Sequence, residues 1–173
     1  MIRRARAVRY DRQAGNGRTQ PLRVAVETID GQEHDLFLKP SAAPELDVEG
    51  LCCEVLAACV GGQLELPLCE PMLVEIEPDW IRSLREPDVR EVLERSNPIA
   101  FGSVAAGEGW SPWVPTDRVT ADRRDMARAI FAFDALIVNP DRGRPENPNL
   151  LVKGASFRIS VKRRANGRDN YWR

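Results

Sequence analysis

Lys39 is the first residue of this sequence whose type and position suggest chemistry. Of the 25 Lys and Arg residues only three are Lys, and Lys39 is the only one before residue 153. It ends an apolar run, Leu36-Phe37-Leu38. A compact ammonium on a long stem suits the α and β phosphates of a nucleotide better than a broad guanidinium does. The position therefore indicates either a phosphate-binding lysine or an ordinary surface lysine at a strand end.

A second group of candidate residues lies in the segment NPDRGRPENPNLLV, residues 139–152. Asp141 follows an expected helix, and Asn147 and Asn149 precede an expected apolar strand. Phosphoryl transfer uses such a pair, because the Asp accepts the proton of the substrate hydroxyl and the Asn oxygen helps to hold Mg²⁺. A Pro- and Asn-rich turn without chemistry has the same composition.

Gly15, Gly17 and Thr19 belong to the short segment GNGRT, ahead of the first apolar strand pattern. Glycines leave the backbone N–H groups accessible, as a loop that covers phosphates requires. An ordinary connecting loop also fits these residues.

The first part of the chain has the pattern of a small sheet with one helix. Residues 22–39 alternate as a β-hairpin does. Residues 46–60 carry apolar side chains at helical spacing, and Gly61-Gly62 is expected to end that helix. Glu54 lies on the flank of the apolar face, from which it could pair with Lys39. The expected buried face consists of Val48, Leu51, Cys52, Val55, Leu56 and Cys59.

The second half of the chain has a mainly helical or irregular pattern. A helix is expected to begin at Pro87, a long loop to cover residues 97–115, and the longest helix to cover residues 121–138. Asp134 lies among the apolar residues of this last helix, where an unpaired carboxylate would be costly. We therefore expect Asp134 to hydrogen-bond to the loop that follows, in a structural role.

The net charge of −1 hides a strong asymmetry along the chain. Residues 1–23 hold seven Arg against one Asp, and residues 153–173 hold seven Lys or Arg against one Asp. Basic ends could bind nucleic acid through its phosphates, but neither end interleaves aromatic residues with its charges as a binding module does. Nucleic acid is therefore disfavoured as a partner.

The overall composition, with 43% hydrophobic and 29% charged residues, predicts one soluble domain or two small lobes that share a cleft. No stretch approaches the roughly 20 apolar residues that a membrane span needs, and the arginine-rich start leads into no apolar signal core. These features predict no membrane association and a cytoplasmic location.

Metal and hydrolase chemistry based on Cys and His is disfavoured. His34 is the only histidine and the sequence has no CxxC pair, so common zinc sites and Ser-His-Asp or Cys-His hydrolases are poorly supported. Cys52 and Cys59 would lie about 10 Å apart on a helix, beyond disulfide reach. We expect all four cysteines to be reduced thiols in the core.

Several of these segments together resemble HipA-like kinases, a branch of the protein-kinase-like superfamily. The stretch FDALIVNPDR at residues 133–142, followed by NPNLL at residues 147–151, resembles the catalytic loop of that family. Residues 36–39 resemble its nucleotide-binding lysine strand, and residues 51–56 resemble its glutamate helix. The resemblance spans residues 7–154. Further matches are LPLCEP at residues 66–71 and AFGS at residues 100–103.

The resemblance implies an α+β, protein-kinase-like fold. It predicts a small antiparallel-sheet N-lobe with one helix over residues 1–78. A shortened, mainly helical C-lobe with the catalytic loop would cover residues 79–155, and a basic tail unlike the family would cover residues 156–173.

The resemblance also implies an ATP- and Mg²⁺-dependent phosphotransferase. Its acceptor would be a protein Ser or Thr, as in toxin-type members of the family, with an antitoxin-like protein as a further candidate partner. By resemblance, Asp141 is the catalytic carboxylate and Glu54 pairs with Lys39. Asn149 is the preferred Mg²⁺ ligand because it directly precedes the apolar strand, and Asn147 is the other candidate. The implied ATP-binding residues are Lys39, Glu54, Gly15, Gly17 and Thr19.

The sequence departs from the family after the strand that follows Asn149. A second metal-binding Asp in an apolar strand is expected there, but residues 156–173 contain only Asp169, outside any apolar strand pattern. Mg²⁺ would then be poorly held, which predicts weakened activity, as in a truncated or frameshifted product. The alternatives are a non-catalytic, pseudokinase-like nucleotide-binding protein and a nucleic-acid-binding protein that uses its basic ends.

Overall fold

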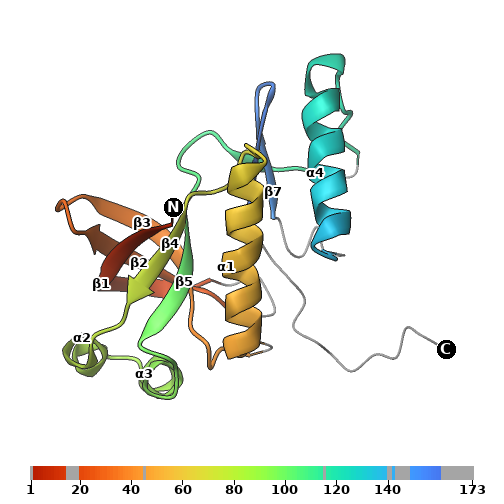
Figure 1. Cartoon of the computed structure of the whole chain (residues 1–173). Helices are drawn as coiled ribbons and strands as arrows, with labels where there is room; N and C mark the ends of the chain where they lie inside the picture. The colour runs from red at the N-terminus through yellow and green to blue at the C-terminus, as the bar shows by residue number, and fades with distance from the viewer. Residues whose placement is uncertain are drawn as a thin grey trace.

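The computed structural model describes residues 2–14, 20–44, 46–114, 116–139, 142 and 149–160. In Figure 1 the strands β1–β5 lie on one side, α1 stands in the middle, and α4 and β7 lie on the other side. The elements in chain order are β1 (Arg3–Gln13), β2 (Leu22–Thr28), β3 (Glu33–Lys39), α1 (Val48–Gln63), β4 (Pro71–Glu75), α2 (Pro78–Ser83), α3 (Pro87–Glu94), β5 (Ile99–Val104), β6 (Ser111–Pro112), the 3₁₀ turn η1 (Ala121–Arg123), α4 (Arg124–Leu136), β7 (Leu150–Lys153) and β8 (Ser156–Ile159).

Five strands form a closed barrel in the order β1-β2-β3-β5-β4. The predicted hairpin over residues 22–39 is confirmed, and its turn contains Gly31 at φ 77°, a conformation that favours glycine. All strand pairs are antiparallel except β1–β4, which is parallel and closes the barrel from Arg3↔Met72 to Arg6↔Glu75. The barrel core is aliphatic, with Val24, Val26, Leu36, Leu38, Met72 and Val74 fully buried.

The predicted architecture, a kinase-like antiparallel N-lobe followed by a mainly helical C-lobe, is wrong. The structure is a small α+β domain built around the closed barrel. The basic start, residues 3–13, forms β1, and residues 99–104 of the predicted loop form β5 between β3 and β4. Helices α2 and α3 add their apolar side chains to the barrel core rather than to a second lobe. The helix predicted from Pro87 is confirmed as α3.

Helix α1 has 16 residues and turns a different face to the core than the one predicted. Its buried residues are Leu51, Glu54, Ala57, Ala58 and Gly61, whereas Val48, Cys52, Leu56 and Cys59 of the predicted face are exposed. Small residues face the core because neighbouring side chains come very close. A Cβ at Gly61 would lie 3.2 Å from both Leu68 and Phe133. Gly61 and Gly62 both lie inside α1, so the prediction that they end the helix is wrong.

Helix α4, of 13 residues, packs with the three-stranded sheet β6-β7-β8 in a second buried cluster. The predicted longest helix over residues 121–138 is therefore shorter than α1 and begins with a 3₁₀ turn. Strand β8 is tied to the segment ahead of β4, since Ile159 N donates to Pro67 O at 2.9 Å and Cys69 N donates to Ile159 O at 2.7 Å. The predicted domain boundaries at residues 78 and 155 stay a prediction.

The surface differs from the sequence-based expectations in two respects. Cys52 and Cys59 are exposed, Cys53 is half-buried and only Cys69 is buried, so the prediction of four core thiols is wrong. The arginines of β1 are largely ion-paired, as in Arg6–Glu27 at 2.8 Å, Arg3–Glu70 at 3.0 Å and Arg9–Glu33 at 3.2 Å. Within the described residues, no helix combines the length and apolar character needed to cross a membrane.

Candidate functional site

Lys39 and Glu54 form a buried ion pair between the barrel and α1. Lys39 is the last residue of β3, and its Nζ lies 2.5 Å from Glu54 Oε2. The same Nζ lies 5.8 Å from the ring centroid of Phe101, the cross-strand neighbour of Lys39 on β5. The Asp47 side chain caps the start of α1 by accepting from Gly50 N at 2.7 Å, which fixes where the helix begins. The pairing implied by the family resemblance is thus present.

The burial of this pair is unusual for charged side chains. Only 9% of the Lys39 side chain and 1% of the Glu54 side chain are exposed. Removing two charges from water costs several kcal/mol for each, roughly, so a buried pair is weak evidence for stability. The pair is therefore a candidate functional site rather than an evident source of stability.

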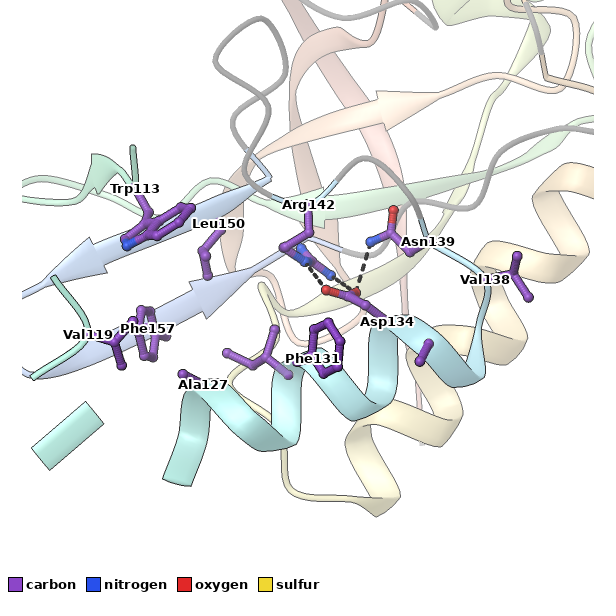
Figure 2. A pocket seen from close by; sticks show the side chains of 12 residues that line it. Trp113, Val119, Ala127, Phe131, Asp134, Val138, Asn139, Arg142, Leu150 and Phe157 are labelled. Carbon is purple, nitrogen blue, oxygen red and sulfur yellow. Dashed lines mark hydrogen bonds and ion pairs between the residues drawn. The ribbon is translucent and has the colours of Figure 1, made fainter. Parts of the chain in front are cut away.

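Asp134, near the end of α4, is held by the segment that follows the helix, as predicted. Asn139 Nδ2 donates to Asp134 Oδ1 at 2.9 Å. Arg142 donates to both carboxylate oxygens, from Nε at 2.8 Å and from Nη2 at 2.7 Å. Figure 2 shows the three side chains converging at the end of α4. The carboxylate that would be costly alone is therefore fully engaged in a structural network.

Asn149 stands directly before β7 and is 3% exposed. Its carbonyl oxygen accepts from Arg142 Nη1 at 2.6 Å and from Ser160 N at 3.2 Å. Its side-chain Oδ1 and Nδ2 have no hydrogen-bond partner among the described residues. Buried amides are normally satisfied, so this one has the property expected of a side chain that binds something else.

One apolar cluster lies beneath both parts of the candidate site. Phe101, which contacts Lys39, and Leu150, which follows Asn149, belong to the same buried cluster. This shared core connects the β3–β5 side of the barrel with the β7–β8 sheet. The Lys39–Glu54 pair and Asn149 are therefore supported by one packed core rather than by independent loops.

The other predicted site residues, Asp141, Asn147, Gly15, Gly17 and Thr19, lie outside the described residues. Their predicted roles stay predictions. Among the residues that are described, no group of three or more His, Cys, Asp or Glu could hold a metal ion. A metal site that includes Asn149 would therefore have to draw further ligands from the ATP phosphates, from water or from the rest of the chain.

Arg142 was not identified from the sequence as a residue of the candidate site. Its side chain bonds to Asp134, to the carbonyl of Asn149 and to the carbonyl of Ser160, the last at 3.1 Å. The available signal was its position directly after Asp141 and eight residues after a carboxylate embedded in an apolar helix.

The family model of HipA-like kinases matches residues 12–162 of this chain. The chain belongs to the HipA-like kinase family. The match begins inside β1 and covers both Lys39 and the segment from Asp134 to Asn149. No curated protein and no solved structure matches this chain significantly.

A cavity of about 580 Å³ lies between α4 and the β7–β8 strands (Figure 2). Its polar end is formed by Asp134 and by Asn139 and Arg142, which both donate to the Asp134 carboxylate. The cavity therefore presents a mainly apolar surface, and neither Lys39 nor Glu54 lines it. Apolar lining residues include Trp113, Ile130, Phe131, Val138, Leu150 and Phe157.

Proposed function

We propose that this HipA-like kinase binds ATP with Mg²⁺ and transfers the γ-phosphoryl group to the hydroxyl of a protein Ser or Thr. The observation that carries the proposal is the buried Lys39–Glu54 pair at 2.5 Å. A lysine whose ammonium is held by a carboxylate has a fixed position, which is what a phosphate-binding lysine requires. Membership of the HipA-like kinase family supports the reaction class, and the sequence resemblance supports the acceptor class.

Each candidate residue has a role in this proposal. Lys39 binds the ATP phosphates, and Glu54 holds Lys39 in place. Asn149 contributes an amide oxygen to Mg²⁺, and its unsatisfied buried side chain fits that role. Asp141 accepts the proton of the acceptor hydroxyl. Bound Mg²⁺ would supply charge neutralisation on the phosphates during the transfer.

Binding is tested first by thermal unfolding with ATP, with and without Mg²⁺. At an ATP concentration of 100 times Kd, binding adds about 2.7 kcal/mol to the stability, which should raise Tm by about 5–10 °C for a chain of this length. Lys39→Arg keeps a cation beside Glu54 but removes the compact ammonium, so we expect it to lose the shift. Lys153→Arg is the matched control, because among the described residues Lys153 bonds only to the Glu108 carbonyl, in an exposed position.

Transfer is tested separately from binding. Asp141→Asn should bind ATP as the wild type does but should not form a phosphorylated protein, as detected by mass spectrometry. If the wild type binds ATP with Mg²⁺ and yields no phosphorylated protein with any tested acceptor, the non-catalytic nucleotide-binding alternative replaces the kinase proposal. A wild-type chain whose Tm does not respond to ATP would contradict both.

A further inference from the structure

Arg142 makes four hydrogen bonds that converge from three parts of the chain. Its Nε and Nη2 donate to the two oxygens of Asp134 on α4, at 2.8 and 2.7 Å. Its Nη1 donates to the carbonyl of Asn149 before β7, at 2.6 Å, and to that of Ser160 after β8, at 3.1 Å. The guanidinium thus links the end of α4 to both strands of the β7–β8 hairpin.

This arrangement requires the planar fork of Arg. The Arg142 side chain is only 11% exposed and the Asp134 side chain 9%. A lysine ammonium at the same place is a single point donor that cannot hold a carboxylate bidentately and reach two carbonyl groups in the opposite direction. The network therefore depends on the residue type and not on positive charge alone.

The bond to Asn149 is the part of the network with a functional consequence. The Asn149 carbonyl accepts a shorter hydrogen bond from Arg142, at 2.6 Å, than from Ser160 N, at 3.2 Å. Arg142 therefore fixes the backbone from which the Asn149 side chain projects. That side chain is the one buried amide whose two polar atoms have no partner among the described residues.

We propose that Arg142 is a positioning residue that fixes the Asn149 amide for Mg²⁺ binding, and that Asp134 orients Arg142 for this task. The inference rests on the proposed function, because it assigns Arg142 to the same ATP·Mg²⁺ site. It adds that Arg142 touches neither nucleotide nor metal and acts through Asn149. Groups that orient a metal ligand change metal affinity by about 10- to 100-fold when removed.

The experiment compares the affinity for ATP in EDTA with the affinity in Mg²⁺, measured by calorimetric titration. In Arg142→Lys we expect the affinity in EDTA to equal that of the wild type, because Lys39 is untouched. The factor by which Mg²⁺ increases the ATP affinity should fall by about 10-fold or more. Arg128→Lys is the matched control, since Arg128 on α4 makes an exposed ion pair with Asp125 and no other ion pair within the part of the chain that the structure describes. It should behave as the wild type.

A double variant tests whether Arg142 acts through Asn149. Asn149→Ala should itself abolish most of the Mg²⁺ effect, and adding Arg142→Lys should cause no further loss. A purely structural role would instead lower the ATP affinity in EDTA as well, and its losses would add to those of Asn149→Ala. Either of these two results overturns the proposal.

The outcomes separate this inference from the proposed function. A wild-type Mg²⁺ effect that persists in Arg142→Lys overturns the positioning role and leaves the ATP·Mg²⁺ site intact. A wild type without any Mg²⁺ effect overturns both. If Arg142→Lys does not fold, Asp134→Asn, which keeps one acceptor for Arg142, should show a smaller loss of the Mg²⁺ effect with unchanged affinity in EDTA. An unchanged Mg²⁺ effect in that variant overturns the role assigned to Asp134 and Arg142.

Discussion

The buried ion pair predicts a distinct pattern of stability in a double-mutant cycle. Lys39→Met leaves the Glu54 carboxylate without its ammonium, and Glu54→Met leaves the Lys39 ammonium without its carboxylate. With side-chain exposures of 9% and 1%, each single change should cost about 3–5 kcal/mol of unfolding free energy. The double variant removes both charges and fills the space with thioether side chains of similar length, so it should be within about 1–2 kcal/mol of the wild type.

Urea unfolding followed by circular dichroism measures this cycle. With a slope of about 2 kcal/mol per molar urea, the single variants should unfold about 1.5–2.5 M earlier than the wild type, and the double variant should recover most of the difference. Lys153→Met is the control and should change the unfolding free energy by less than about 0.5 kcal/mol. The reasoning is refuted if each single variant is as stable as the control, or if the double variant loses the sum of both single losses.

Three further changes test the cap of α1, the packing of the barrel and the buried thiol. Asp47→Ala removes the acceptor for Gly50 N, so the unfolding free energy in urea should fall by about 1 kcal/mol, whereas Asp47→Asn should retain most of the stability. Gly102→Ala places a methyl group 2.7 Å from Leu36 Cδ1, whose side chain is fully buried, and should cost about 1–3 kcal/mol in the same assay; an unchanged midpoint would contradict the tight packing of β3 on β5. Burial raises the pKa of the Cys69 thiol. The neutral Cys69 thiol therefore makes its full contribution to stability below the unfolded-state pKa of about 8.5, and this contribution is lost as pH rises toward the folded-state pKa. In urea unfolding, Cys69→Ala should lose less unfolding free energy at alkaline pH than the wild type does.

Local patterns predicted those elements whose side chains alternate cleanly between core and solvent. The β2–β3 hairpin and the place of Lys39 at its end follow from period-two alternation. The bonding of Asp134 follows from the cost of a lone carboxylate among apolar residues, which holds in any fold. In both cases the physical reason is local to the segment.

Strand β1 could not be recognised in the same way. Its inward residues include Ala5 and Ala7, which bury little surface, and its outward residues are mostly arginines. Because Arg6 and Arg9 form ion pairs with residues on β2 and β3, the strand depends on partners that are distant in the sequence. The sequence therefore indicated only an arginine-rich end of the chain at this position, and not a strand.

The orientation of α1 could not be predicted from the sequence either. The side of the helix that carries Cys52 and Leu56 is more hydrophobic than the side that carries Glu54 and Ala57, yet the latter side is buried. Of the predicted apolar face, Leu51 is buried with it and Val55 is partly buried. That face has small residues such as Ala57 and Ala58, which allow close approach of the helix to the core, and it carries Glu54 toward Lys39. This orientation depends on tertiary contacts, namely the close packing of the small residues and the Lys39–Glu54 pair, which the local apolar pattern does not show.

The parallel β1–β4 pairing has a practical consequence for work with this protein. Residues 12–162 are matched by the family model, yet β1 begins at Arg3, so trimming the chain to the matched range would delete nearly all of this strand. Strands β2 and β4 would then each expose a row of unpaired N–H and C=O groups at a free edge, and free edges recruit strands from other molecules. Such a trimmed protein should aggregate on expression, so the first eleven residues belong in any sample prepared for nucleotide-binding assays.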